Sequence, residues 1–396
     1  MLTNKTIVLG VTGGISAYKA AYIASSLTQS GASVKVVMTK SATQFIGPQT
    51  FSSLTNNKVI TEMFESPSEP TVWHITLARE ADVMVVAPAT ANIIAKLAAG
   101  IADDVLTATA LATKAPVIIA PAMHGQMLRN PATQHNLATL RERGAIIIEP
   151  EYGRLAAGDI GPGRLTDPDR IIGAIKQALG KSGDMAGKRV VVTAGGTQEP
   201  IDPVRHIGNP SSGKMGYALA EAARDRGAAV TLITAPASLP LPSGIETIPV
   251  RTTDEMKTEV TKATAQADVL LMAAAVSDFR TKEIAKEKVK KDASSLNLEL
   301  VRTPDILAGT TGQFTRVGFA AESENIVANA KEKLAKKQLD LIVANDITDA
   351  ESGFGTDTNK VTLIDRNGNE ETLPLLSKRE VADKILDRVV GLLSQI

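Results

Sequence analysis

The feature that most constrains the fold is one local pattern, first met at the N-terminus. Residues 6–12 (TIVLGVT) form an apolar, β-branched run that leads directly into Gly13 and Gly14. A stretch with helical spacing follows over residues 16–30, and a second apolar run occupies residues 34–39. Continuous apolar runs alternating with amphipathic helices are typical of a parallel sheet that is covered on both faces.

The second half of the chain repeats this pattern. Residues 189–193 (RVVVT) lead to Gly195 and Gly196, and after a longer insert a helix is predicted over 213–226. The next strand is predicted over 230–234. Each half also has a buried strand predicted at a run that begins with aspartate, 82–88 (DVMVVAP) in the first half and 268–275 (DVLLMAAA) in the second. The approximate duplication predicts an α/β protein with two doubly wound, Rossmann-like parallel-sheet domains in tandem.

The boundary between the halves is predicted in the polar, glycine-rich segment 180–187 (GKSGDMAG). The predicted domains are therefore residues 1–180 and 187–396. Ligands are expected at the carboxyl ends of the strands in each. Residues 376–396 have helical spacing and predict a closing helix, to which the sequence assigns no function.

Composition excludes several classes of function. Lys plus Arg and Asp plus Glu both number 43, and aromatic residues make up 3% of the chain, so a surface that coats nucleic acid or an anionic membrane is not expected. The absence of cysteine excludes disulfides and thiol catalysis. No apolar run reaches the roughly 18 residues that span a bilayer, and residues 1–12 indicate a strand rather than a signal peptide. The expectation is a cytoplasmic protein.

A glycine turn between a strand and a helix can bind phosphate, because backbone N–H groups and the positive end of the helix dipole face the anion. Such turns are also common structural features. A nicotinamide dinucleotide site requires an acidic residue at the end of the second strand, but Thr39, Lys40 and Ser41 stand there in the first half. Their hydroxyl groups and the lysine ammonium suit a phosphate monoester better than a ribose hydroxyl. Residues 208–215 (GNPSSGKM) miss the P-loop pattern because Met215 replaces the hydroxyl residue that binds magnesium.

Several stretches, taken together and in order, resemble one family: the bifunctional phosphopantothenoylcysteine decarboxylases / phosphopantothenate–cysteine ligases of coenzyme A biosynthesis. Each motif is weak alone, whereas their joint order over nearly the whole chain is specific. In the first half the similar segments are 13–19 (GGISAYK), 88–92 (PATAN), 121–127 (PAMHGQM) and the substrate-clamp segment 158–164 (GDIGPGR). In the second half they are 193–197 (TAGGT), 202–205 (DPVR), 209–216 (NPSSGKMG), 273–279 (AAAVSDF), 288–291 (KVKK) and 345–346 (ND).

The resemblance implies that the first half is an FMN-dependent decarboxylase, in which the flavin takes electrons from the cysteinyl thiol and later returns them. His74 is the candidate for proton transfer, since histidine titrates near neutral pH; without the resemblance it would be interpreted as a capping or surface residue. Thr90 and Asn92 are expected to meet flavin or substrate, or else to cap a helix. The flavin-binding candidates are Gly13, Gly14, Ser16, Thr39, Ser41, Thr90, Asn92 and Met123.

Two positions depart from the best-known pattern of the family. Many members have Asn where this chain has His124, and many have an acidic cysteine where it has Ala157. A natural subtype and an engineered replacement both remain open for Ala157. We hypothesise that the two departures are linked and that His124, as an imidazolium, supplies the proton that Ala157 cannot.

The resemblance also implies that the second half is a ligase that activates a carboxylate with CTP through an acyl-cytidylate. A triphosphate requires a helix N-terminus, cations and usually Mg²⁺. Lys288 resembles the lysine that stabilises developing phosphate charge, although its segment 281–291 (TKEIAKEKVKK) alone would be interpreted as a solvated helix. Arg205 and Asn209 resemble residues that hold the acyl intermediate, and Asp278 is the candidate for ribose, base or metal. The remaining nucleotide-binding candidates are Gly195, Gly196, Ser211, Ser212, Gly213, Ala273, Ala275, Pro304, Asp305, Ile306, Phe319, Lys333 and Lys337.

Family members assemble through trimers of the flavin domain and dimers of the ligase domain, so the resemblance implies a homo-oligomer that can be a dodecamer. Its partners are small molecules: 4′-phosphopantothenate, L-cysteine and CTP. Two other classes of function stay open at this point. One is an NAD(P)-dependent oxidoreductase with two Rossmann-like domains, and the other is a non-catalytic flavin-binding regulatory protein.

Overall fold

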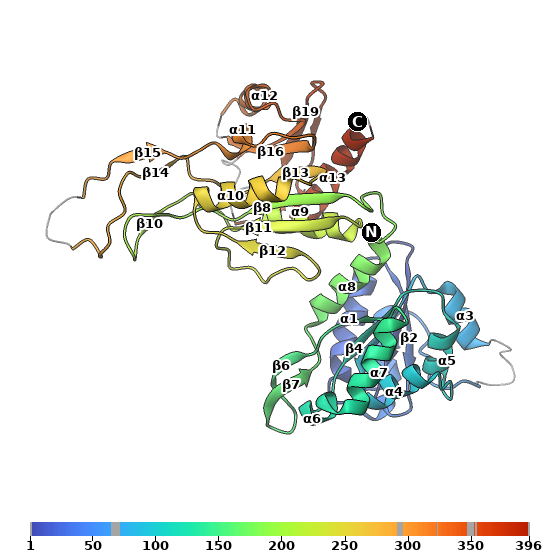
Figure 1. The fold of residues 1–396 in the computed structure, drawn as a ribbon. Coiled ribbons are helices and arrows are strands. Elements are labelled where there is room, and N and C mark those ends of the chain that lie inside the picture. Colours follow the sequence, from blue (N-terminus) through green and yellow to red (C-terminus); the bar gives the residue numbers. More distant parts are fainter. Residues whose placement is uncertain are drawn as a thin grey trace. The chain divides into compact units, whose positions relative to one another are not determined.

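The structure is a computed structural model that describes residues 2–64, 72–290, 296–322, 324–346, 352 and 355–394. The chain divides into two compact units, Met1–Leu179 and Gly180–Ile396 (Figure 1). Each unit has its own sheet and its own buried core.

Unit 1 is built on a sheet of five parallel strands in the order β2-β1-β3-β4-β5. The predicted run 6–12 forms β1 (Thr6–Val11), which pairs with β2 (Ser33–Met38) on one side and β3 (Val83–Ala89) on the other. All seven residues of β3 are buried, as its unbroken apolar sequence predicts for a central strand. The edge beyond β3 is formed by β4 (Val117–Pro121) and β5 (Ile146–Ile147).

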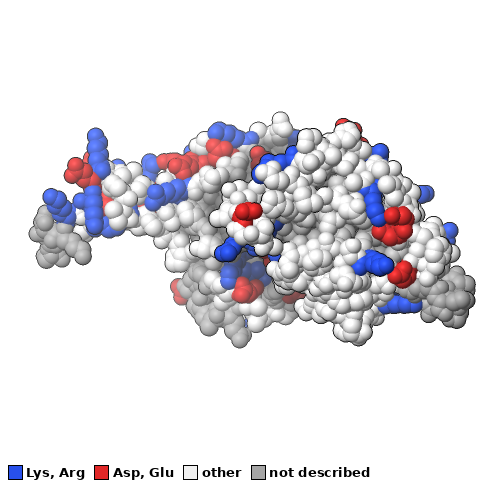
Figure 2. Space-filling model, turned by 90° about the horizontal axis from the view of Figure 1, so that it is seen from below, with Lys and Arg blue, Asp and Glu red and all other residues white. Residues whose placement is uncertain are grey.

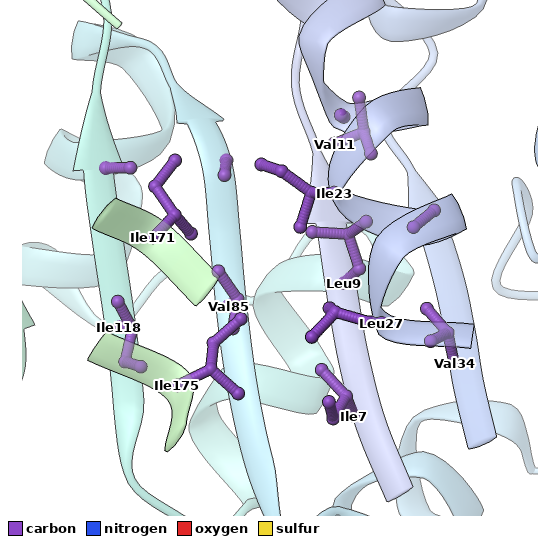
Figure 3. Close-up of a cluster of buried hydrophobic side chains, with 14 of the residues drawn as sticks. Ile7, Leu9, Val11, Ile23, Leu27, Val34, Val85, Ile118, Ile171 and Ile175 are labelled. Carbon is purple, nitrogen blue, oxygen red and sulfur yellow. The ribbon is translucent and has the colours of Figure 1, made fainter. Parts of the chain in front are cut away.

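Helices cover both faces of this sheet. On one face, α1 (Ala17–Gln29), α2 (Pro48–Thr55) and α8 (Pro168–Gly180) pack against alternate strand residues, and Figure 3 shows Ile23 and Leu27 of α1 beside Leu9 of β1. On the opposite face lie α3 (Trp73–Glu80), α4 (Ala91–Ala99), α5 (Val105–Ala112) and α7 (Pro131–Glu142). Burying each such Ile or Leu side chain stabilises the fold by about 1.5–3 kcal/mol.

A hairpin follows the sheet of unit 1 and packs onto the loop after β4. Its strands are β6 (Glu151–Arg154) and β7 (Ile160–Arg164), and the loop leads into the short helix α6 (Gly125–Arg129). The backbone N–H of Met123 donates to the carbonyl of Gly163 at 2.9 Å. A Cβ at Gly163 would lie 2.0 Å from the Met123 carbonyl oxygen, so this close contact requires glycine.

Unit 2 has an eight-stranded sheet in the order β12-β11-β8-β13-β16-β17-β19-β20. Its strands run parallel from β12 to β17, and β19 and β20 are antiparallel additions at one edge. The strands are β8 (Arg189–Ala194), β11 (Ala229–Thr234), β12 (Glu246–Pro249), β13 (Val269–Met272), β16 (Thr315–Glu322), β17 (Leu341–Asp346), β19 (Val361–Asp365) and β20 (Glu370–Thr372). The predicted α/β class with tandem Rossmann-like units is confirmed.

Two helical layers cover the sheet of unit 2. α9 (Lys214–Asp225) and α13 (Lys378–Leu393) pack on one face. On the other face lie α10 (Thr253–Thr264), α11 (Ile306–Gly309) and α12 (Ile326–Lys336). α9 lies within the helix predicted over 213–226 and α13 is the predicted closing helix, whereas no prediction covers α10, α11 or α12.

Unit 2 also contains short strand pairs outside its main sheet. β9 (Glu199–Pro200) pairs with β10 (His206–Ile207), and β18 (Thr358–Asn359) pairs with β21 (Leu376–Ser377). The longer arm of β14 (Phe279–Thr281) and β15 (Leu300–Arg302) extends away from the sheet in Figure 1. In Figure 2 this arm carries both basic and acidic side chains, and the signs are also interspersed over the rest of that face.

Two local predictions are wrong. The strand predicted over 268–275 ends at Met272, because the chain then bends so that Ala275 meets Gly196 in an isolated bridge. The helical interpretation of 281–291 fails as far as residue 290, the last one described there: this part forms no helix, and Thr281 still belongs to β14. None of the helices in the described part of the chain combines the length and apolar character that crossing a bilayer requires.

Candidate active sites

The first candidate site lies at the carboxyl edge of the sheet in unit 1. A Cβ on Gly13, just after β1, would lie 2.5 Å from the Cβ of Ser41, so the segment after β2 contacts the turn after β1. Thr39 is half-buried and its N–H donates to the Val11 carbonyl at 3.0 Å. The structure therefore brings Gly13, Thr39 and Ser41 together, as the parallel arrangement of β1 and β2 requires.

The N-terminus of α1 offers unpaired donors at this edge. Within the described residues, no hydrogen bond takes up the backbone N–H groups of Gly14, Ile15 and Ser16. Ser16 is the N-cap residue of this 13-residue helix, and its side chain makes no capping hydrogen bond. A Cβ on Gly14 would meet nothing within 4 Å. Free N–H groups, a helix dipole and open space fit the phosphate of a flavin nucleotide.

The end of β3 is tied to the end of β1 by threonine side chains. Thr12 donates from its hydroxyl to the Pro88 carbonyl at 2.7 Å and accepts from the Thr90 N–H at 3.1 Å. Thr90 also caps α4, since its Oγ1 accepts from the Ile93 N–H at 3.3 Å. The capping role that the sequence allowed for Thr90 is therefore present, and its hydroxyl proton stays available to a ligand. Asn92 is exposed in the first turn of α4.

His74 lies in the first turn of α3 and is half-buried. No described residue makes a hydrogen bond with its ring. The neighbouring indole of Trp73 has a buried Nε1 without a hydrogen-bond partner among the described residues, and the Lys58 ammonium lies 5.3 Å from the centre of its ring. The imidazole of His74 is thus free to exchange a proton with a bound molecule.

His124 joins the loop after β4 to the β6–β7 hairpin. Its Nε2 lies 3.0 Å from the Asp159 carboxylate, and its Nδ1 accepts from the Gln126 N–H at 3.3 Å. An accepting Nδ1 places the proton of the neutral ring on Nε2, which then donates to Asp159. Ala157 is exposed in the tip of the same hairpin. The hairpin thus places the Asp159 carboxylate next to His124. Asp159 lies two residues after Ala157, the position at which the sequence departs from the family pattern.

The second candidate site begins at the glycine turn after β8. Gly195 has φ +78°, and a Cβ there would lie 2.6 Å from the Ala235 carbonyl oxygen. A Cβ on Gly196 would lie 2.5 Å from the Asn209 carbonyl oxygen, so the insert folds back over the turn. The amide of Asn209 donates to the Val276 carbonyl at 3.1 Å. Glycine is required at both positions by these backbone contacts.

A cavity of about 830 Å³ lies along the carboxyl edge of the sheet in unit 2. Most of the ligase-site residues predicted for this half line it, whereas Gly195 and Gly196 do not. The volume is in the range of small-molecule sites. These lining residues are Asn209, Ser211, Ser212, Gly213, Ala273, Ala275, Asp278, Pro304, Asp305, Ile306, Phe319, Lys333 and Lys337. The structure thus brings together residues that are up to 128 positions apart, between Asn209 and Lys337.

One end of this cavity is formed by β16, α11 and the C-terminal end of α12. The Lys333 ammonium donates to the Phe319 carbonyl at 2.8 Å. Burial, followed by repulsion from Lys337, lowers the pKa of Lys333. Lys337 pairs with Asp305 at 3.1 Å. Burial opposes ionisation of Asp305, but the Ala308 N–H and the Lys337 ammonium together hold its pKa below the ordinary value. This end is therefore cationic and partly dehydrated, as a nucleotide site requires.

Arg205 and Lys288 do not line this cavity. The buried carboxylate of Asp202 accepts from the Arg205 guanidinium and from the Val289 N–H, and Arg205 also donates to the Val289 carbonyl at 2.7 Å. Burial opposes its ionisation, yet the backbone N–H groups of Val204 and Arg205 and the guanidinium hold the pKa of Asp202 far below its usual range. Arg205 thus anchors the segment that carries the exposed Lys288.

Asp278 is exposed at the rim of the cavity, directly before β14. Within the described residues, no three His, Cys, Asp or Glu side chains come together as a metal cage. Mg²⁺ commonly binds one or two carboxylates together with substrate phosphates and water. A single carboxylate at the mouth of a nucleotide cavity fits that mode of binding.

Sequence reasoning missed several residues that line the cavity. Lys214 and Lys378 stand at the first positions of α9 and α13, although the sequence assigned no function to the closing helix. A lysine is unfavourable at the positive end of a helix dipole, and this local violation is the signal that could have identified both. The other missed lining residues include Thr303 and Asn359.

Comparisons with known proteins match the two units of the chain to two different families. Residues 1–180 match the family described as Flavoprotein, and residues 185–393 match the DNA/pantothenate metabolism flavoprotein C-terminal domain. The coenzyme A biosynthesis bifunctional protein CoaBC of Bacillus subtilis (strain 168) is 46% identical over 402 residues, which cover 100% of this chain and 99% of the relative. The protein of that name from Escherichia coli (strain K12) is 42% identical over 396 residues, covering 98% and 97%.

A crystal structure of the C-terminal domain of a protein with that name is also similar, with 38% sequence identity and a TM-score of 0.47. The match covers 54% of this chain and 100% of that one. The identity over the full length of both chains, together with the two family matches, settles the relationship. The chain belongs to the family of bifunctional coenzyme A biosynthesis enzymes, which combine a phosphopantothenoylcysteine decarboxylase with a phosphopantothenate–cysteine ligase.

Proposed function

We propose that unit 2 joins cysteine to 4′-phosphopantothenate at the expense of CTP, through an acyl-cytidylate. The cavity along its sheet carries this proposal, because it combines a dehydrated cationic end, the N-terminus of α9 and a carboxylate at its mouth. The nucleotide base and ribose lie at the end formed by Phe319, Lys333 and Lys337. The phosphates extend toward Ser211, Ser212 and Gly213 at the start of α9.

In the first step, the carboxylate of 4′-phosphopantothenate attacks the α-phosphorus of CTP and pyrophosphate leaves. The amide of Asn209, held by the Val276 carbonyl, orients the acyl group beside Ala273 and Ala275. Asp278 would hold Mg²⁺, which would offset the negative charge of the phosphates. In the second step, the cysteine amine attacks the acyl carbon, forms the amide bond and releases CMP.

Lys288 and Arg205 act from the segment outside the cavity. The Asp202–Arg205 pair fixes the backbone of Val289, so Lys288 projects from an anchored stretch of chain. We propose that its ammonium stabilises the charge that develops on the phosphates during the first step.

We propose that unit 1 decarboxylates 4′-phosphopantothenoylcysteine with FMN to give 4′-phosphopantetheine. The N–H groups of Gly14, Ile15 and Ser16 bind the flavin phosphate, and Thr39, Ser41, Thr90, Asn92 and Met123 surround the cofactor. A bound flavin supplies the electron sink for loss of carbon dioxide and afterwards returns the electrons. His74 moves the proton of the substrate thiol.

The proton that completes the product comes from His124 in this proposal. The Asp159 carboxylate accepts a hydrogen bond from Nε2 and so holds the ring in place. Replacing His124 with Asn tests this step in the full-length protein. We expect carbon dioxide to be released while the saturated product no longer forms; full conversion to 4′-phosphopantetheine in H124N would contradict it.

We further propose that the two reactions run in order within a cytoplasmic homo-oligomer, with trimers of unit 1 and dimers of unit 2. Pyrophosphate release tests the overall assignment. It should require CTP, phosphopantothenate and cysteine together, and the purified protein should show a flavin spectrum without added dinucleotide. Absence of the flavin would favour the dinucleotide oxidoreductase, and a flavin without CTP-dependent release would favour the regulatory protein.

A further inference from the structure

The cavity in unit 2 has a second cationic end, at the start of α9, and its two lysines have no part in the proposed roles. It reaches from the α12 face of the sheet to the face covered by α9 and α13, because Lys214 and Lys378 also line it. The charged lining residues are five cations and two carboxylates, namely Lys214, Arg302, Lys333, Lys337, Lys378, Asp278 and Asp305. The Asp305 carboxylate lies at the far end, paired with Lys337.

Lys378 is only 8% exposed, which is unusual for a lysine. Burial, followed by repulsion from Lys214, lowers its pKa. Its ammonium donates to the Thr356 carbonyl at 2.5 Å. An ammonium has three donors, and this is the one hydrogen bond that Lys378 makes from its side chain to a described residue, so donors remain for a ligand.

Lys214 lies beside Lys378 and contacts the same short segment. Its ammonium donates to the Gly355 carbonyl at 2.8 Å and to Asp357 at 2.7 Å. The carboxylate of Asp357 is 90% exposed, so water screens much of its charge. The pair of ammonium groups therefore faces one solvated carboxylate and neutral carbonyl oxygens.

Both lysines occupy the first position of their helix, after the N-cap residues Gly213 and Ser377. A cation at this position opposes the helix dipole. Two ammonium groups, one of them buried, and the N-terminus of α9 concentrate positive charge at one point of the cavity, whereas the Glu380 carboxylate caps the N-terminus of α13. A multiply charged anion is the group that would stabilise this arrangement.

We propose that Lys214 and Lys378 form a subsite for a phosphate group at the α9–α13 end of the cavity. This inference rests on the proposed ligase function, and it assigns the subsite to the phosphate monoester of 4′-phosphopantothenate. With the nucleotide base at the Phe319 end and the acyl carboxylate at Asn209, the far phosphate of the acyl substrate reaches the opposite end. The terminal phosphate of CTP has the same chemistry and is the second source that the experiment separates.

Calorimetry on the full-length protein compares four ligands: 4′-phosphopantothenate, pantothenate, CTP and CMP. We expect Lys378→Gln to weaken binding of phosphopantothenate about tenfold or more, which is the loss of a charged hydrogen bond. Pantothenate, CTP and CMP should bind as they do to the wild type. Lys378→Arg should restore binding, and Lys384→Gln, which removes an exposed charge from the same helix, should have no effect.

Lys214→Gln gives a second, independent test if Lys378→Gln lowers the thermal stability of unit 2. If the variants bind CTP more weakly and bind CMP as the wild type does, the phosphate subsite exists and binds the terminal phosphate of CTP. If both phosphorylated ligands bind the variants as they bind the wild type, or if pantothenate weakens as much as phosphopantothenate, the subsite does not exist. If the wild-type protein shows no CTP-dependent pyrophosphate release, the ligase function itself is contradicted.

Discussion

The two units share one local motif, a strand followed by two glycines, but surround it with different segments. In both, a parallel strand ends in two glycines at the carboxyl edge of the sheet. In unit 1 the helix follows at once, and its N–H groups stay open beside exposed residues such as Ser41 and Asn92. In unit 2 residues 197–213 intervene and fold back over the turn, and a walled cavity results. The glycine turn supplies an anion site, whereas the surrounding segments decide what can bind there.

The largest effect is expected where a glycine allows two loops to touch. Gly13→Ala places a Cβ 2.5 Å from the Cβ of Ser41 and forces the phosphate turn open. We expect the flavin content of the purified protein to fall at least about tenfold, as for loss of one or two charged hydrogen bonds, while CTP-dependent pyrophosphate release is retained. Absorbance at the flavin bands measures the first quantity.

Gly47→Ala is the matched control, since a Cβ at that position meets nothing within 4 Å. It should keep the flavin content of the wild type. Equal flavin loss in both variants would mean that the turn at Gly13 has no special role.

The next prediction compares Lys333, which is half-buried in the cavity of unit 2, with an exposed lysine of the same helix. Lys333→Met removes the ammonium that donates to the Phe319 carbonyl, so we expect KM for CTP to rise about tenfold. Lys336→Met, on the same helix but exposed, should leave KM unchanged. Steady-state pyrophosphate release measures both, and an equal rise in the two variants would show only a general charge effect.

The pH dependence follows from the same lysine. Burial and Lys337 lower the pKa of Lys333 from its usual 10.5, so its charge is lost as the pH rises through this lowered value. KM for CTP should therefore increase at a pH below that at which an ordinary lysine titrates. Lys333→Arg, which stays charged, should have a flat KM over the same range. A rise of equal size in this variant would assign the titration to another group.

The smallest effect tests whether the units unfold separately. Asp104 caps α5 of unit 1 and Thr252 caps α10 of unit 2, and replacing either with Ala should cost about 1 kcal/mol. The single tryptophan, Trp73, lies in unit 1 and reports on that unit alone. Urea unfolding followed by its fluorescence should shift in D104A but not in T252A, whereas circular dichroism should detect both. A fluorescence shift in T252A would show that the two units unfold together.

The first strands and the first helix of each unit follow directly from the sequence, because runs such as 6–12 and 189–193 are uninterrupted and lead into glycines. The cavity does not follow from such patterns. It depends on where the insert after Gly196 folds and on which helix begins beside it, and both are long-range contacts. Lys378 was missed for this reason, since it lies 164 residues after Lys214.

The segment 281–291 shows the converse error. Its alternating Glu and Lys residues favour a helix locally, but Val289 is held by Asp202 and Arg205, and Ala285 donates to the Ile201 carbonyl at 3.0 Å. With these contacts in place, residues 282–290 form bends and irregular chain instead of a helix. Tertiary contacts thus override a local preference in the part of the chain that carries Lys288.

The most direct test of the account is the pair of activities in Gly196→Ala. A Cβ at Gly196 would lie 2.5 Å from the Asn209 carbonyl oxygen and displace the insert that walls the cavity. The account predicts that CTP-dependent pyrophosphate release is lost, while carbon dioxide release from added 4′-phosphopantothenoylcysteine and the flavin spectrum match the wild type. Retained pyrophosphate release, or loss of both activities in a folded protein, would contradict two separate sites at the two glycine turns.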